Sequence, residues 1–240
     1  MIKKAMEYVS ELTRPTIFTV NERKFADKPL IPIDREPKAE CIRLTTLSSL
    51  VDYIKSGLDF YESYIIHITS PTTVAVYSAL DADRRREHIV TVEAQLSSFR
   101  FGSYIEHEEF CIALQSKFMQ NDNRALLLRF AGTVEDGSVA EYGDDGITQK
   151  ATVKTGIASK TDVIVPNPVS LVPYRTFLEV AQPASEFLFR MSNKGGVQCA
   201  LFEADGGAWK IEAMASIKQY LAEALAEYNE TQGYNFIIIS

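Results

Sequence analysis

The segment from residue 46 to residue 96 combines two periodicities, and this pair constrains the fold more than any other feature of the chain. Apolar residues recur at helical spacing after Thr46, which can cap a helix, and Gly57 supplies a stop signal. Three short runs rich in β-branched and aromatic residues follow, separated by turn residues, at 64–69, 72–78 and 88–96. This pattern predicts one helix followed by a three-stranded antiparallel meander.

The rest of the chain predicts a mixture of helices and strands. A second helix is expected to begin at Glu106, where acidic residues suit the positive end of the helix dipole. Residues 124–131 fit either a helix or a buried strand, because periodicity cannot decide over so short a run. Further strands are predicted at 149–158, 163–165, 175–180, 186–191, 198–203 and 234–239, with a closing helix over 208–228. No repeat is visible, so the fold class is α+β, with mainly antiparallel sheets and three helices.

Prolines and glycines divide the chain into three segments. Residues 1–44 carry four prolines with charges between them and one strand-like run, which is typical of an extended arm or linker. Glycines with acidic neighbours separate an α/β half, residues 45–131, from a β-rich half, residues 132–240. The apolar run 236–239 would be hazardous as a free strand edge. We therefore expect a homo-oligomer, although pairing inside its own sheet would protect this run equally well.

The charge and the cysteines argue against several classes of protein. A net charge of −7 lacks the positive field that draws proteins onto phosphate backbones, so nucleic acid is not the favoured partner. The three cysteines are odd in number and widely spaced, as in proteins of a reducing cytosol. The N-terminus lacks the apolar run of a signal peptide, and no stretch approaches the roughly twenty apolar residues that span a bilayer. We expect a cytoplasmic protein without membrane contact.

The familiar catalytic and metal-binding patterns do not occur in the sequence. There is no G-x-S-x-G nucleophile turn, no phosphate-binding glycine loop and no closely spaced His and Cys pair of a zinc site. The nearest approach to a metal nuclease is Asp81 or Asp83 followed by Glu93, but Gln95 stands where the usual lysine would be. We expect no enzymatic activity, no cofactor and no metal.

One set of basic and aromatic residues in the second half is a candidate for ligand binding. Cations beside aromatic rings bind planar anions by charge and stacking together. Arginine grips a phosphate or carboxylate through two parallel hydrogen bonds, and tyrosine or tryptophan stacks on a planar ligand. Aromatics in the core with arginines at the sheet edge would explain the same residues. The candidates are Lys154, Tyr174, Arg175, Arg190 and Trp209.

Two stretches resemble a known family. One is residues 45–118, which run from TTLSSLVDYIK through YIIHITSPTTVAVYSALD and REHIVTVEAQL to HEEFCIALQSKF. The other is residues 144–221, which include DDGITQKATVKTGIA and ALFEADGGAWKIEAMASIKQYL. Both resemble the YfdQ-like family of uncharacterised proteins encoded in phages and prophages, over roughly two thirds of the chain. The resemblance implies a phage origin and the cytoplasm of an infected bacterium, and it brings no catalytic residues.

These observations favour a non-enzymatic accessory protein of a phage or prophage. We expect it to bind or sequester a host or phage protein, a defence factor or a small anionic ligand. The alternative is an accessory factor of phage DNA replication or recombination that binds single-stranded DNA, which requires a basic groove with stacking aromatics. A third hypothesis is a Mg²⁺-dependent nuclease built on Asp83 and Glu93. Single-strand binding should weaken steeply as salt rises, whereas sequestration through an apolar patch should not.

Overall fold

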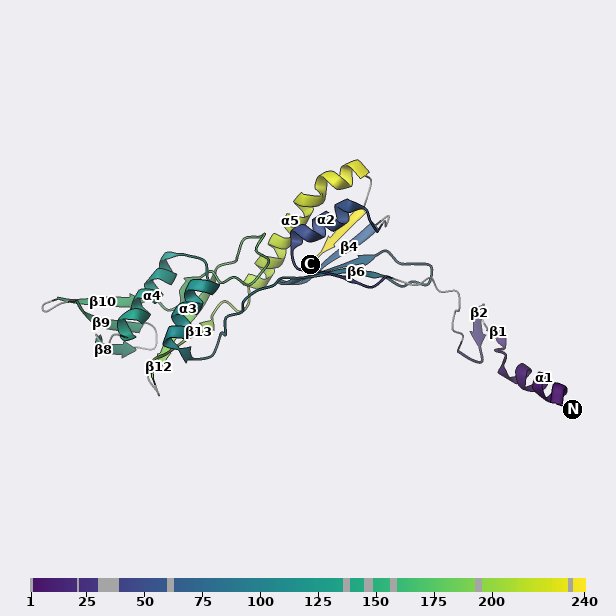
Figure 1. Ribbon diagram of the computed structural model, residues 1–240, viewed down its shortest axis with the longest axis horizontal. Helices are drawn as coiled ribbons and strands as arrows, with labels where there is room; N and C mark the ends of the chain where they lie inside the picture. Colours follow the sequence, from purple (N-terminus) through teal and green to yellow (C-terminus); the bar gives the residue numbers. More distant parts are fainter. Residues whose placement is uncertain are drawn as a thin grey trace. The chain divides into compact units, whose positions relative to one another are not determined.

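The computed structural model describes residues 2–20, 22–29, 39–59, 63–135, 139–144, 149–155, 159–192, 196–232 and 235–240. The chain divides into two compact units, Met1–Ala39 and Glu40–Ser240. We call the first unit the arm. It contains α1 (Ile2–Thr13) and a two-stranded antiparallel sheet of β1 (Ile17–Val20) and β2 (Arg23–Ala26), as Figure 1 shows. Of these three elements the sequence predicted only β1. Helix α1 was not predicted, because it has no acidic residue in its first turn to signal a helix start.

A five-stranded mixed sheet forms one half of the second unit. The strands, in spatial order, are β14 (Asn235–Ile239), β4 (Ser63–Ser70), β5 (Thr73–Ser78), β6 (His88–Glu93) and β3 (Ile42–Leu44). The antiparallel meander of β4, β5 and β6 is confirmed, and at the two edges β14 is parallel to β4 and β3 is parallel to β6. The apolar run 236–239 therefore pairs inside its own sheet.

Two helices cover one face of this sheet (Figure 1). As predicted, α2 (Leu47–Ser56) is capped by Thr46, whose hydroxyl accepts a hydrogen bond from the Ser49 N–H at 3.2 Å, and it ends at the left-handed Gly57. The closing helix α5 (Trp209–Gln232) also matches its prediction closely. Side chains from both helices and from alternate strand positions form the core, including Leu50, Ile54, Ile66, Ile68, Val74, Val76, Val90, Val92, Ile217 and Leu221.

A four-stranded antiparallel sheet with two helices forms the other half. Its strands, in spatial order, are β11 (Val169–Leu171), β12 (Ser185–Ser192), β13 (Gln198–Glu203) and β7 (Ile105–Glu106). Helix α3 (His107–Lys117) begins as predicted, because the Glu106 carboxylate accepts hydrogen bonds from the Glu108 and Glu109 N–H groups. The ambiguous run 124–131 lies in a helix, α4 (Asp122–Glu135). The core here is rich in phenylalanine, with Phe110, Phe118, Phe130, Phe187 and Phe189 all buried.

The predicted strand over 175–180 is wrong, because these residues form a loop organised by Gln182. The Gln182 Oε1 atom accepts hydrogen bonds from the Arg175 and Thr176 N–H groups at 3.0 and 3.2 Å. Its Nε2 atom donates to the Phe177 carbonyl at 2.9 Å and to two others at 3.3 Å. The side chain thus satisfies backbone groups that a neighbouring strand would otherwise pair.

A third sheet completes the second unit. Its strands, in spatial order, are β10 (Ser159–Val165), β9 (Gln149–Thr155) and β8 (Val139–Asp144), of which β8 was not predicted. The α+β class is confirmed, with five helices among the described residues where the sequence predicted three. None of the helices in the described ranges combines the length and the apolar character needed to cross a membrane.

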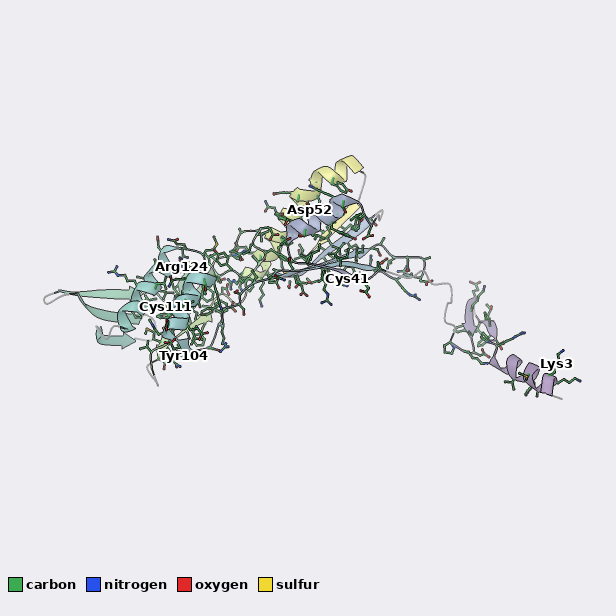
Figure 2. All side chains as sticks on the ribbon, in the orientation of Figure 1. Lys3, Cys41, Asp52, Tyr104, Cys111 and Arg124 are labelled. Atoms are coloured by element: carbon green, nitrogen blue, oxygen red, sulfur yellow. The ribbon has the colours of Figure 1, made fainter. Side chains whose placement is uncertain are left out.

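None of the three cysteines, all of which lie in the described ranges, forms a disulfide, and their surroundings differ. Figure 2 shows Cys41 beside the five-stranded sheet and Cys111 on α3. Cys199 is fully buried in β13, and this burial, with smaller contributions from Cys111 and Glu106, raises the pKa of its thiol to about 12. At neutral pH the thiolate fraction of Cys199 is therefore about a thousandfold lower than that of a thiol with the usual pKa of 9.0.

Thiol labelling should separate Cys199 from Cys41. We expect a maleimide to modify half-buried Cys41 in the native protein and Cys199 only after unfolding, because the thiolate is the reactive form. Peptide mass spectrometry of native and denatured samples measures this. Native labelling of Cys199 at the rate of Cys41 would contradict the position of β13 in the core.

Candidate ligand-binding pocket

A pocket of about 290 Å³ lies where segments from the two halves of the second unit meet. Its walls come from four separated parts of the chain: the β4–β5 turn, the segment after β6, the end of α3 and the segment after β11. This volume lies just below the range usual for small-molecule sites, roughly 300–1,000 Å³, so only a small ligand would fit. The lining residues are Thr72, Ala94, Leu96, Ser98, Phe99, Phe101, Lys117, Pro173, Tyr174 and Arg175.

Backbone hydrogen bonds fasten these segments to one another. The Ala94 N–H donates to the Thr72 carbonyl at 2.9 Å, which ties the segment after β6 to the β4–β5 turn. The Tyr174 N–H donates to the Lys117 carbonyl at 2.9 Å, which ties the segment after β11 to the end of α3. The Thr176 hydroxyl donates to the Pro71 carbonyl at 2.6 Å. The pocket is therefore held open by paired backbone and does not depend on a free loop.

Two phenylalanines give the pocket an aromatic wall with a fixed orientation. The Phe99 ring lies edge-on to Phe118, with 5.2 Å between ring centroids, and 4.9 Å from the Phe101 ring. The Phe101 ring stacks on Phe187 at 5.1 Å. Because their partners belong to the core of the four-stranded half, these rings are locked before any ligand binds.

Lys117 provides a positive charge at the pocket. Its Nζ donates a hydrogen bond to the Ser98 carbonyl at 2.6 Å, which holds the ammonium group in place. Within the described part of the chain, no carboxylate forms an ion pair with it. An ammonium group has three donors, so Lys117 keeps donors for a ligand.

Arg175 is the most constrained side chain of the pocket, with 8% exposure. Its Nη1 donates to Glu203 Oε1 at 3.0 Å, and its Nη2 donates to the Ser185 hydroxyl. The Ser185 hydroxyl in turn donates to Asp205. The guanidinium lies 4.0 Å from the centre of the Trp209 ring, a cation–π contact.

The surroundings of Arg175 and Asp205 favour the charged form of each side chain. Burial lowers the pKa of Arg175, while the charges of Glu203 and Asp205 oppose that change, and arginine stays protonated in proteins. Burial also acts to raise the pKa of Asp205. Hydrogen bonds from Ser185 and Gly207 and the charge of Arg175 outweigh it and leave that pKa lowered. At neutral pH the Arg175 charge is thus already balanced by neighbouring carboxylates.

Two buried donors beside this network lack an acceptor among the residues that the structure describes. They are Arg175 Nε and Trp209 Nε1. Leaving such a group unpaired costs about 1–3 kcal/mol, so buried orphan donors are uncommon and call for an explanation. Both atoms have almost no solvent-accessible surface, so a ligand in the pocket could reach them only after the side chains around them move.

The structure brings together three of the five residues predicted for the site. Tyr174 and Arg175 line the pocket, and Trp209 stacks on Arg175. Arg190 lies on β12, away from the lining, and its Nη1 donates to the adjacent Phe189 carbonyl at 2.9 Å. The backbone of Lys154 belongs to β9, and its side chain lies outside the part of the chain that the structure describes.

Sequence reasoning missed Lys117, Phe99 and Phe101. They come from a helix end and an irregular segment, and neither carries a motif. The one available signal was the alternation of aromatic and basic residues over Phe99-Arg100-Phe101. This pattern does not show which part of the structure the two aromatic side chains contact.

The carboxylates considered for a nuclease do not come together. Asp81 accepts from the Arg85 N–H at 2.7 Å and Asp83 pairs with Arg85 at 3.6 Å, both inside the β5–β6 turn. Glu93 lies at the opposite end of β6. In the described residues, no group of three or more His, Cys, Asp or Glu side chains could hold a metal ion.

Comparison of the chain with protein-family models, curated proteins and solved structures finds no match. The interpretation of the pocket therefore rests on its own geometry and chemistry.

Proposed function

We propose that this protein is a non-enzymatic binding protein that takes a small planar anion in this pocket. The observation that carries the proposal is the presence, in one pocket, of the Lys117 ammonium and fixed aromatic walls. Pockets that bind small molecules typically combine apolar walls with a few directed polar groups.

The two cations have different roles in this proposal. The charge of Arg175 is balanced by Glu203 and Asp205, so this residue would hold the wall of the pocket in place and would not supply net charge to the ligand. Lys117 supplies the net positive charge that selects a carboxylate or phosphate. The planar part of the ligand would stack against Phe99, Phe101 and Tyr174.

The charge of the second unit favours a small ligand over single-stranded DNA. The whole chain has 25 basic and 32 acidic residues, of which 8 and 6 fall in residues 1–39. Residues 40–240 therefore hold 17 basic and 26 acidic residues, a net charge of −9. A backbone-tracking groove needs the opposite sign over a long surface, whereas one lysine suffices for one anionic group.

The resemblance to the YfdQ-like phage family suggests the setting. In that setting the protein would sequester a host or defence-system ligand in the bacterial cytoplasm, and sequestration needs affinity without turnover.

Native mass spectrometry of the full chain purified from bacterial cells tests the proposal. We expect a small-molecule adduct that denaturation releases. Loss of a charged hydrogen bond weakens binding about tenfold or more, so Lys117→Met should carry much less of the adduct. Lys218→Met, a matched change on the exposed side of α5, should retain it. An adduct that is equally abundant in both variants, or a wild-type protein without one, would contradict the proposal.

A further inference from the structure

The segment that joins β11 to β12 is longer than the connection requires. The two strands are antiparallel neighbours, and Leu171 pairs with Ser185 where they end and begin. A hairpin loop usually has about 2–5 residues, whereas residues 172–184 separate these two strands. Long loops outside helices and strands are uncommon in compact domains and are often functional. The length of this loop therefore needs a reason in the fold.

The tip of this loop, residues 176–180, is anchored in the five-stranded half of the second unit. Phe177 is 1% exposed and belongs to the hydrophobic core of that half. The Thr176 hydroxyl donates a hydrogen bond to a carbonyl of the β4–β5 turn at 2.6 Å. The Glu179 carboxylate accepts hydrogen bonds from the first two N–H groups of α2 at 2.8 and 3.3 Å, which have no acceptor inside the helix.

The base of the loop stays attached to the four-stranded half. The Tyr174 N–H donates to a carbonyl at the end of α3 at 2.9 Å. The Arg175 guanidinium donates to Glu203 on β13 at 3.0 Å and to the Ser185 hydroxyl on β12. Gln182 ties the base to the tip, because its amide oxygen accepts from the N–H groups of Arg175 and of the next residue. The loop is therefore fixed at both ends, each in a different half.

Residues 174–182, which we call the strap, join two separate cores. The buried apolar side chains of the described residues form one cluster in each half. Two halves with separate cores are expected to move and unfold separately unless their contact couples them. Phe177 lies in sequence between Leu171 and Phe187 of one core and is itself part of the other. We propose that the strap couples the two halves, so that they unfold together and the pocket keeps the walls that each half supplies.

The ligand step of this coupling rests on the proposed function. The pocket lies at the base of the strap, and its walls include Thr72 from the five-stranded half and Lys117 from the four-stranded half. A ligand that contacts both walls would favour docked halves, and by linkage docked halves would favour the ligand.

Urea unfolding of the full chain, followed by hydrogen exchange and mass spectrometry, tests the coupling without a ligand. Peptides from β5 report on the five-stranded half, and peptides from β12 report on the four-stranded half. In the wild type both should lose protection at one urea midpoint. Leu221→Ala truncates a buried core side chain of α5 outside the strap and should lower both midpoints together. Phe177→Ala should split the transition, with the β5 midpoint below the β12 midpoint by about 1 M or more.

Two further variants keep the test decisive if Phe177→Ala does not fold. Glu179→Ala leaves both cores intact and removes only the contact with α2, so it should separate the midpoints in the same direction by a smaller amount. Leu178→Ala changes a strap residue that is 67% exposed and should retain the single midpoint. One midpoint shared by β5 and β12 in both the Phe177 and the Glu179 variant, or two midpoints already in the wild type, would overturn the proposal.

Titration with benzoate and with adenosine monophosphate separates this coupling from the proposed function. For a compound that the wild type binds, Phe177→Ala should raise the Kd about fivefold or more, although Phe177 does not line the pocket. An unchanged Kd would contradict the ligand step of the coupling. No binding of either compound by the wild type would contradict the proposed function alone, since the unfolding midpoints decide whether the strap couples the halves.

Discussion

Truncation of Phe189 to alanine is expected to lower the free energy of unfolding by about 3–5 kcal/mol, the range for a buried phenylalanine. Phe189 lies on β12 with no exposed surface. Its ring packs against Phe110 of α3, with 5.7 Å between ring centroids, and edge-on against Phe130 of α4, with 5.8 Å between ring centroids. The substitution thus removes the side chain that joins both helices to the sheet. Urea unfolding followed by circular dichroism measures the loss.

Leu178→Ala is the matched control for this change. Leu178 is 67% exposed in the loop before β12, so its truncation should change the free energy of unfolding by no more than about 0.5 kcal/mol. Equal effects of the two substitutions would show that the phenylalanine cluster is not the core of this half.

Replacement of Arg175 by methionine is expected to lower the free energy of unfolding by about 3 kcal/mol, near the lower limit for breaking a buried ion pair. The change removes the hydrogen bonds to Glu203 and Ser185 and the stacking on Trp209. The effect stays near the lower limit because the Glu203 side chain is 37% exposed and water can solvate it. Thermal and urea unfolding measure this loss.

Two further variants separate the parts of this effect. Arg175→Lys keeps the positive charge but not the planar fork, so it should recover only part of the stability. Arg190→Met removes an arginine that does not line the pocket and should have a much smaller effect. A loss below about 1 kcal/mol in Arg175→Met would mean that this network does not hold the pocket.

The elements that could be predicted from the sequence are those whose signals are local. Helix α2 has its cap at Thr46 and its stop at Gly57, and the meander has turn residues between alternating runs. The start of α3 depends on Glu106, which caps N–H groups two and three residues further along the chain. In each case the deciding contact lies within a few residues in the sequence.

The features that could not be predicted depend on contacts between distant residues. Residues 175–180 have the composition of a strand, and only the fold shows that Gln182 takes their backbone hydrogen bonds. The pocket could not be predicted for the same reason, because its lining residues Thr72, Lys117 and Tyr174 come from separate segments of the chain. The sequence identified Tyr174, Arg175 and Trp209 by residue type alone, and it had no signal for the charge that Lys117 adds.

The single tryptophan of the chain offers the most direct test of ligand binding in the pocket. Because Trp209 stacks on Arg175, its one indole N–H resonance reports on the site. We expect this resonance to shift saturably when benzoate or adenosine monophosphate is titrated into the wild-type protein or Lys218→Met. In Lys117→Met the affinity should fall about tenfold or more. No shift with either compound, or the same affinity in Lys117→Met, would contradict the assignment of this pocket as an anion-binding site.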